Sequence, residues 1–402
     1  MKKRILLSIL LALVMTMTGC KTQVQKEAKK RYDRPLPPGQ SALRKITDPL
    51  EIPDFTLACL DLTDLRTAVG NSVSYMNKPS SRSYFPVGDI THKRALDSLN
   101  EFARMLDSGL RGAELNDAIR RNFDVYTSIG CDDEGTVLFT GYYTPIFAGS
   151  FEPSDVFKYP LYKQPDDLIK GENGEILGRK LPRGDVTPYP PRAVIEDSRM
   201  LRGQELVWLT DPFEVYIAHV QGSAKLRLPN GQLETVGYAA NNGHEYRSVA
   251  EAMVGDGRIP GDEISLSKMI EYFKRYKDQI DTYIKRNPRF VFFKKEPGPP
   301  LGCLNEPVTT LRSIATDKSI FPRGSLTFIS TTLPRAAGGV AIKQLYSGFS
   351  LDQDAGGAIR APGRCDVYMG VGDTAGMLAG QTYQEGRLYY LFLRETGRIT
   401  DY

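Results

Sequence analysis

Histidine, net charge and long apolar runs are all scarce in this sequence of 402 residues. The three histidines, His92, His219 and His244, match no metal-ligand spacing, and no Ser-His-Asp arrangement accompanies them. The formal net charge of +4 is too small for the concentrated basic stripe that is typical of nucleic-acid binding. We therefore expect no metal, no cofactor and no nucleic-acid partner.

The composition is that of a folded protein with many turns. Hydrophobic residues make up 41% and charged residues 25%, both ordinary for globular domains, and 37 glycines with 26 prolines indicate frequent turns. This favours a mainly β architecture. The length predicts two domains, at about 100 to 200 residues for each domain.

The N-terminus has the pattern of an export signal. A basic segment, residues 2–4, precedes an apolar run, residues 5–17, which is too short to span a bilayer. The run is followed by Gly19-Cys20, which is either part of an ordinary cleavage site or, as we favour, a lipobox with Cys20 as the lipidated residue. Several acyl chains together anchor a protein stably, and Lys21 then indicates the outer membrane by the usual sorting pattern.

Residues 21–50 contain little that could build a core. They hold few apolar side chains, an excess of basic ones, and three prolines, Pro35, Pro37 and Pro38. We interpret them as an extended tether between the export signal and the folded body.

The cysteines beyond the signal are even in number. In the oxidising compartment that an export signal implies, one or two disulfides are possible, and buried free thiols are equally possible. These cysteines are Cys59, Cys131, Cys303 and Cys365.

Hydrophobic periodicity predicts both helices and strands in the remaining chain. Helical spacing occurs at residues 92–110, 113–123, 248–254 and 265–285. Strands are predicted near residues 137–143, 207–209, 214–220, 225–228, 232–237, 290–293, 308–314 and 325–329. The helices carry no chemistry of their own, so we interpret them as packing elements around a β core.

Residues 351–372, LDQDAGGAIRAPGRCDVYMGVG, concentrate carboxylates and glycines. Asp354 precedes Gly356-Gly357, so it lies where a strand ends in a tight loop and its carboxylate can face a cleft. The alternation after the following Pro-Gly turn places Asp366 at the start of another strand.

This stretch resembles a known family. DAGGAIR, CDVYMGVGD and AGMLAG are similar to the 3D domain, named for its three aspartates, of MltA-type membrane-bound lytic murein transglycosylases. FTGYYTP, YPLY, HVQGSAKLRL, GYAANNGHEYRSV and NPRFVFF extend the resemblance, in unbroken order, over roughly the last two-thirds of the chain. Two positions depart from the pattern: Ala361 stands where the family usually has glycine, and Cys365 precedes the key aspartate.

The resemblance implies a mainly β fold. A double-psi β-barrel catalytic domain would carry an inserted second, smaller β-barrel domain and packing helices, with a groove between the two domains. With residues 1–20 as lipoprotein signal peptide and 21–50 as tether, residues 51–145 and 290–402 would form the catalytic barrel and residues 146–289 the insert.

The resemblance also implies a catalytic residue. Asp366 would be the acid and then the base, with Asp354 and Asp317 positioning or supporting it. Cleavage of a glycosidic bond needs a carboxyl group that stays protonated near neutral pH, and burial or a neighbouring carboxylate raises a pKa in that direction.

Further residues are candidates for binding a sugar. Tyr142 and Tyr143 adjoin on a predicted strand and face opposite sides, so one ring can reach a surface and stack on a sugar. The polar turns around Gly222 and Gly243 could line a cleft for amides and hydroxyls, or could serve as turns only. The expected substrate-binding residues are Thr140, Tyr142, Tyr143, Gln221, Gly222, Ser223, Asn242, Gly243, Tyr246, Gly356 and Gly357.

The expected activity is that of a lytic transglycosylase in cell-wall turnover. Such an enzyme cuts the β-1,4 bond between N-acetylmuramic acid and N-acetylglucosamine and leaves a 1,6-anhydromuramic acid. Its partners would be peptidoglycan strands, the periplasmic face of a Gram-negative outer membrane through a lipid anchor, and proteins of cell-wall synthesis or division. Two alternatives stay open: a glycoside hydrolase that uses Asp354 and Asp366 together, and a non-catalytic peptidoglycan-binding lipoprotein.

Overall fold

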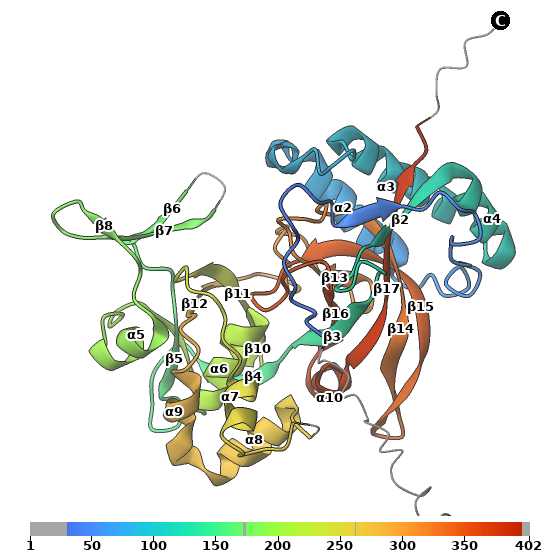
Figure 1. The fold of residues 1–402 in the computed structure, drawn as a ribbon. Helices are drawn as coiled ribbons and strands as arrows, with labels where there is room; N and C mark the ends of the chain where they lie inside the picture. Colours follow the sequence, from blue (N-terminus) through green and yellow to red (C-terminus); the bar gives the residue numbers. More distant parts are fainter. Residues whose placement is uncertain (1–29, 172–173, 262, 396–402) are drawn as a thin grey trace, which may run out of the picture. The chain divides into compact units, whose positions relative to one another are not determined.

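The computed structural model describes residues 30–171, 174–261 and 263–395. The chain divides into a short N-terminal unit, Met1–Arg31, and a large unit, Tyr32–Tyr402, which holds all the elements named below (Figure 1). The predicted export signal and the predicted lipidation residue Cys20 lie outside the described residues. In the described ranges no helix has both the length and the apolar character needed to cross a bilayer.

Six strands close into a barrel. They follow one another around the ring in the order β17, β14, β15, β13, β16 and β3, and the pairing of β17 with β3 completes it. Pairs β13–β15 and β16–β3 are parallel, while the other four are antiparallel. The strands are β3 (Val137–Thr144), β13 (Ser313–Ala315), β14 (Leu326–Ala337), β15 (Val340–Asp354), β16 (Arg364–Val371) and β17 (Tyr383–Leu393). The predicted double-psi barrel class is confirmed.

Two further strands extend the barrel sheet beyond β17. Strand β2 (Phe123–Ser128) pairs with β17, and β1 (Leu43–Lys45) pairs with β2. Ala42 and Ile46 on either side of β1 are buried. The prediction of a tether as far as residue 50 is therefore wrong at its end, because the last residues of that segment pair with the barrel sheet.

Helices α2 (Leu65–Asn77), α3 (His92–Asp107) and α4 (Gly112–Asn122) lie beside the barrel (Figure 1), and the last two were predicted. Helix α3 begins where the Thr91 side chain accepts the N–H of Arg94, an N-cap bond. Its residues Leu99 and Phe102 are fully buried, and they belong to one apolar cluster that runs from the helices into the barrel. Burial of such an apolar stripe, rather than helix propensity, stabilises the layer.

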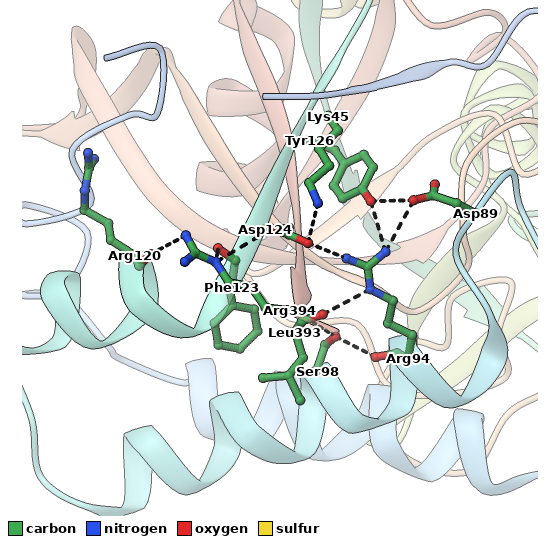
Figure 2. A network of polar contacts seen from close by, with 10 residues as sticks. All are labelled: Lys45, Asp89, Arg94, Ser98, Arg120, Phe123, Asp124, Tyr126, Leu393 and Arg394. Atoms are coloured by element: carbon green, nitrogen blue, oxygen red, sulfur yellow. Dashed lines mark hydrogen bonds and ion pairs between the residues drawn. The ribbon is translucent and has the colours of Figure 1, made fainter. Parts of the chain in front are cut away.

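An ion network fastens α3 to the barrel sheet (Figure 2). Arg94 donates to the carbonyl oxygen of Leu393 at 3.0 Å and to the hydroxyl of Tyr126 at 3.0 Å. Its guanidinium also pairs with Asp124 at 2.8 Å and with Asp89 at 3.4 Å. Every nitrogen of this buried guanidinium has an acceptor, which keeps the cost of burying its charge low.

A second six-stranded sheet lies between β3 and β13 in the sequence, in the order β12-β11-β10-β4-β9-β5. Its two end strands meet at a single bridge, Lys163–Phe293. The strands are β4 (Ile146–Ser150), β5 (Tyr159–Tyr162), β9 (Glu205–Leu209), β10 (Ser223–Arg227), β11 (Leu233–Asn241) and β12 (Val291–Lys295). The boundary at residue 290 is wrong: β12 was assigned to the catalytic barrel, but it pairs with β11.

Shorter elements complete this second domain. A three-stranded sheet contains β6 (Leu168–Lys170), β7 (Ile176–Lys180) and β8 (Val186–Thr187). The helices are α5 (Arg192–Ser198), α6 (Pro212–Gln221), α7 (Val249–Gly255), α8 (Leu266–Arg275) and α9 (Ile280–Ile284). Of these, α7 matches its predicted range closely.

Residues 214–220 are helical, so the predicted strand there is wrong. Asp211 caps α6 by accepting the N–H of Phe213 at 2.7 Å, and Pro212 opens the first turn. Phe213, Tyr216, Ile217 and Ala218 are all buried. A helix that is buried on several faces has no clean 3.6-residue periodicity, and its apolar residues then imitate a strand.

The predicted helix at residues 265–285 is broken. Tyr276 leaves the helical region at φ −124° and ψ 64°, so α8 ends there, and a 3₁₀ turn, Lys277–Gln279, leads into α9. The strand predicted near residues 308–314 is reduced to β13, because Leu311 has a positive φ of 59° just before it. Of the four cysteines, Cys59, Cys303 and Cys365 are free thiols, so no disulfide joins any two of the four.

Candidate active site

Two aspartates and a threonine form a row across four barrel strands. Ala315 of β13 is the register partner of Asp354, at the end of β15, and of Asp366 of β16 on its other side. Asp366 in turn lies opposite Thr140 of β3. Neighbouring strands are about 4.8 Å apart and residues in register share a face, so the aspartate Cα atoms lie roughly 10 Å apart across the small side chain of Ala315.

Asp366 is half-buried on the wall of a cleft and is incompletely hydrogen-bonded. Its Oδ1 is buried and has no hydrogen-bond partner among the described residues. Burial raises the pKa of its carboxyl group to about 6, and the charge of Asp354 adds to the rise, while the Arg364 guanidinium and the Thr140 hydroxyl oppose it. A large fraction of Asp366 is therefore protonated at pH 6.

Asp354 is held by the backbone around it. Its Oδ1 accepts the N–H groups of Cys303 at 2.9 Å and of Ala355 at 2.8 Å. Burial raises the pKa of this carboxyl group, against the effect of these two N–H groups, of the Tyr142 hydroxyl and of the Lys318 charge. The two aspartates are thus in different environments, because backbone donors fix Asp354 and leave Asp366 open.

Tyr142 closes one side of the row. Its ring lies 5.1 Å from that of its register partner Tyr368, centroid to centroid, at a tilt of 50°. Burial raises the pKa of the Tyr142 hydroxyl well above its usual value, and the nearby Asp354 adds to this. The hydroxyl therefore remains a hydrogen-bond donor at any physiological pH.

Asp317 is buried behind the loop that joins the two other aspartates. Its Oδ2 accepts the N–H of Ala361 at 2.9 Å, and its Oδ1 accepts the N–H of Ser319 at 3.1 Å. Ala361 has a φ of 68°, a left-handed conformation that favours glycine. The Asp317 carboxylate thus fastens a strained residue of this loop, and it does not line the cleft.

A cleft of about 580 Å³ opens over the row of aspartates, which is within the usual size for ligand sites. The barrel contributes both Asp354 and Asp366, while the second domain contributes Gln221 and Ser223. The Gln221 Oε1 accepts the N–H of Tyr143 at 3.1 Å and so ties the end of α6 to β3. A smaller hollow of about 160 Å³ shares part of this lining.

Most of the predicted binding residues meet at these two hollows. The residues that line one or both are Tyr142, Gln221, Gly222, Ser223, Tyr246, Gly356 and Gly357. Thr140 lies beside Asp366. The sequence blocks that carried these predictions are far apart in the chain, and the fold brings them together.

Besides Thr140, three predicted binding residues are not among the described residues that line the hollows. Tyr143 is buried against α10 (Asp373–Gln381), where a Cβ on Gly376 would come within 2.8 Å of its ring. Asn242 donates to two backbone carbonyls and accepts the N–H of Phe290 at 2.8 Å. Gly243, with φ of 78°, completes that turn. The backbone thus uses the Asn242 side chain in this turn, whereas Tyr246 of the same segment lines the smaller hollow.

Several cleft residues were missed by the sequence interpretation. Arg289, Tyr238, Arg360 and Tyr368 all line the larger hollow. Arg289 stands directly before an apolar strand in the block NPRFVFF, which is the only sequence signal that could have drawn attention to it. Within the described ranges no group of three or more His, Cys, Asp or Glu residues could hold a metal ion.

Two family models match the chain over the parts just described. The MltA specific insert domain matches residues 138–294, and the 3D domain matches residues 312–392. Membrane-bound lytic murein transglycosylase A of Vibrio cholerae is 30% identical over 277 residues, which are 66% of this chain and 68% of the relative. The chain belongs to the membrane-bound lytic murein transglycosylase A family. The Escherichia coli K12 member is 28% identical over 283 residues, 70% of this chain and 72% of the relative.

Solved structures of family members have the same fold. A membrane-bound lytic murein transglycosylase from Agrobacterium tumefaciens aligns with a TM-score of 0.74 at 24% identity, over 88% of this chain and 98% of the other. Escherichia coli MltA with bound chitohexaose aligns with a TM-score of 0.66 at 23% identity, over 92% and 98%.

Proposed function

We propose that this MltA family member is a lytic transglycosylase that cleaves the β-1,4 bond between N-acetylmuramic acid and N-acetylglucosamine in peptidoglycan. The relatives named above are murein transglycosylases, and one was crystallised with a chito-oligosaccharide. The observation that carries the proposal is the state of Asp366. Its carboxyl group lies in the cleft with one oxygen unpaired, and its pKa is raised to about 6.

Protonated Asp366 is suited to begin the reaction. It gives its proton to the oxygen of the departing N-acetylglucosamine as the bond from that oxygen to C1 of the muramic acid breaks. The resulting carboxylate then takes the proton of the C6 hydroxyl of the same muramic acid, and the C6 oxygen bonds to C1. The products are a 1,6-anhydromuramic acid and a free hydroxyl on the departing sugar, with no water consumed and Asp366 protonated again.

The tethered hydroxyl has an advantage over water as the nucleophile. Well-oriented intramolecular groups reach effective molarities that lower a barrier by about 7 kcal/mol or more. The chain therefore needs no second carboxylate to activate water. Asp354 already accepts two backbone N–H groups, and its charge helps to raise the pKa of Asp366.

The two-carboxylate hydrolase is the competing proposal, since Asp354 and Asp366 share one face of the barrel. Digestion of purified murein in ¹⁸O-labelled water separates the two by mass spectrometry. The transglycosylase gives an unlabelled anhydro product. Incorporation of ¹⁸O at C1 of the cleaved muramic acid would establish hydrolysis instead, and absence of any cleavage would favour a non-catalytic binding protein.

We also propose that a lipid on Cys20 anchors the protein to the periplasmic face of the outer membrane. The relatives are named membrane-bound, and Gly19-Cys20 follows a short apolar run. The Cys20→Ala variant should then take up no labelled fatty acid in growing cells. Labelling equal to that of the parent would contradict the anchor. Contacts with proteins of cell-wall synthesis or division stay a prediction.

A further inference from the structure

Arg289 occupies an unusual place in the cleft. It lines both the larger and the smaller hollow. A Cβ built on Gly357 would lie 3.1 Å from its Nε, so the guanidinium lies against the loop that follows Asp354. Its Nη1 donates to the carbonyl oxygen of His244 at 3.1 Å, which holds the head group in place.

The charge of Arg289 is not balanced by the described part of the chain. Among these residues no carboxylate lies within 4.0 Å of its guanidinium, although the side chain is only partly exposed. Burial lowers the pKa of the guanidinium, and the like charge of Arg360 lowers it further, while Tyr238 opposes both. Arg360 lines the same hollow, and its nearest carboxylate, Asp317, is 3.9 Å away.

A partly buried cation that has no anion beside it lowers the stability of the folded protein. The cost is recovered when a ligand brings the missing negative charge. A guanidinium presents a planar fork that matches the two oxygens of a carboxylate, and such bidentate pairs are among the strongest hydrogen-bonded contacts in proteins. Arg289 lies against the Gly357 backbone, so an anion that it binds would lie near the two aspartates.

We propose that Arg289, assisted by Arg360, forms a subsite for a carboxylate carried by the muramic acid of the substrate. This inference rests on the proposed function. In a β-1,4-linked murein strand the two sugars alternate, and only the muramic acid bears a lactyl group, with a free carboxylate or with a peptide stem that has carboxylates of its own. A carboxylate subsite beside the aspartates therefore selects which of the two kinds of bond reaches Asp366.

Binding by the Asp366→Asn protein tests the subsite without any cleavage. Three ligands are compared by calorimetry: chitohexaose, which has no carboxylate, murein strands stripped of peptides, and murein strands that keep their stems. Adding Arg289→Gln should weaken binding of at least one carboxylate-bearing strand by about tenfold. Binding of chitohexaose should stay within about twofold.

Comparison of the two carboxylate-bearing ligands identifies the source of the carboxylate. A loss with stripped strands assigns the lactyl group, and a loss only with stem-bearing strands assigns the peptide. Arg289→Lys keeps the charge and should recover part of the affinity, while Arg227→Gln, at an exposed position at the end of β10, is the matched control.

Two results would overturn the subsite while leaving the proposed function intact: equal losses for all three ligands, or no loss for any. Failure of the Asp366→Asn parent to bind any of the three ligands would instead remove the proposed function, and the subsite with it.

Discussion

The Arg94 network and the aspartate row are both polar clusters of the barrel domain, but they differ in how completely their charges are paired. In the first, Arg94 has four acceptors, and Asp124 also forms an ion pair with Lys45 at 2.7 Å (Figure 2). In the second, one oxygen of Asp366 is buried without a partner. Burial thus accompanies complete pairing in the Arg94 network, and it accompanies an unpaired oxygen and a raised pKa in the aspartate row.

Strand β15 contains two carboxylates, two residues apart, that have different partners. Asp352 is fully buried and is bonded to the hydroxyl groups of Thr316 and Tyr390 and to the ammonium group of Lys318. Asp354 faces the cleft and accepts two backbone N–H groups. A buried carboxylate that makes all its hydrogen bonds stabilises the fold, whereas burial of Asp366 with one oxygen unpaired raises its pKa and leaves a proton available for chemistry. The unpaired carboxyl oxygen of Asp366 therefore costs the fold some stability and provides the proton for catalysis.

The largest expected effect is that of Asp366→Asn. Asparagine keeps the size and polarity of the side chain but cannot cycle between acid and base, so the rate of murein cleavage should fall by about 10³-fold. The free energy of unfolding should not fall by more than about 1 kcal/mol, since no hydrogen bond in the described part of the fold depends on the unpaired Oδ1. Cleavage at the parental rate by the folded variant would move the acid to another residue.

Arg94→Ala should have the opposite signature. It removes a buried guanidinium whose bonds join α3 to Leu393, Tyr126 and Asp124, and it should lower the free energy of unfolding by about 3 kcal/mol, as measured by urea denaturation. Activity per folded molecule should remain that of the parent. A selective loss of activity under conditions where the variant stays folded would mean that the two clusters are coupled.

The pH dependence should also differ between the clusters. The raised pKa of about 6 means that protonated Asp366 is lost as the pH rises through 6, so the turnover rate should fall on that alkaline limb. By linkage, the stability that this group contributes is present below its ordinary pKa near 4 and is lost as the pH rises through about 6. Asp354→Asn removes a charge that raises the pKa of Asp366 and should move the limb to lower pH. An unchanged limb in that variant would contradict the coupling.

The smallest effect is expected at Ala361. Its φ of 68° is strained for alanine, and glycine relieves the strain. Ala361→Gly should therefore raise the free energy of unfolding, by at most about 1 kcal/mol because glycine also gains freedom in the unfolded chain. Thermal melting measures the change, with Ala358→Gly in the same loop as a control that should gain nothing. A lower melting temperature for Ala361→Gly would show that the strain is absent.

Local signals in the sequence predicted the individual pieces of the site well. The glycine pair after Asp354 and the alternation after the Pro-Gly turn placed this aspartate at a strand end and Asp366 near a strand start, as the structure has them. The row itself was beyond local reasoning. It depends on the register of β13 between β15 and β16, which pairs residues up to about fifty positions apart and is set by closure of the barrel.

The failures also have physical causes. Helix α6 was taken for a strand because it is buried on several faces and shows no helical periodicity. Asn242 was taken for a cleft residue because its amide can make the same hydrogen bonds to a ligand that it makes to the backbone. Arg289 was passed over because an arginine before a strand is usually exposed. Only the tertiary structure shows that its guanidinium lies in the cleft.

Direct titration of Asp366 tests the central claim, that burial with incomplete pairing keeps this carboxyl group protonatable near neutral pH. The protein labelled with ¹³C at aspartate carboxyl groups is titrated by NMR, and the signal that disappears in Asp366→Asn identifies the residue. A midpoint near pH 6 is predicted. A midpoint near 4, the ordinary value for an aspartate, would contradict the account, because Asp366 would then be ionised when the glycosidic oxygen needs its proton.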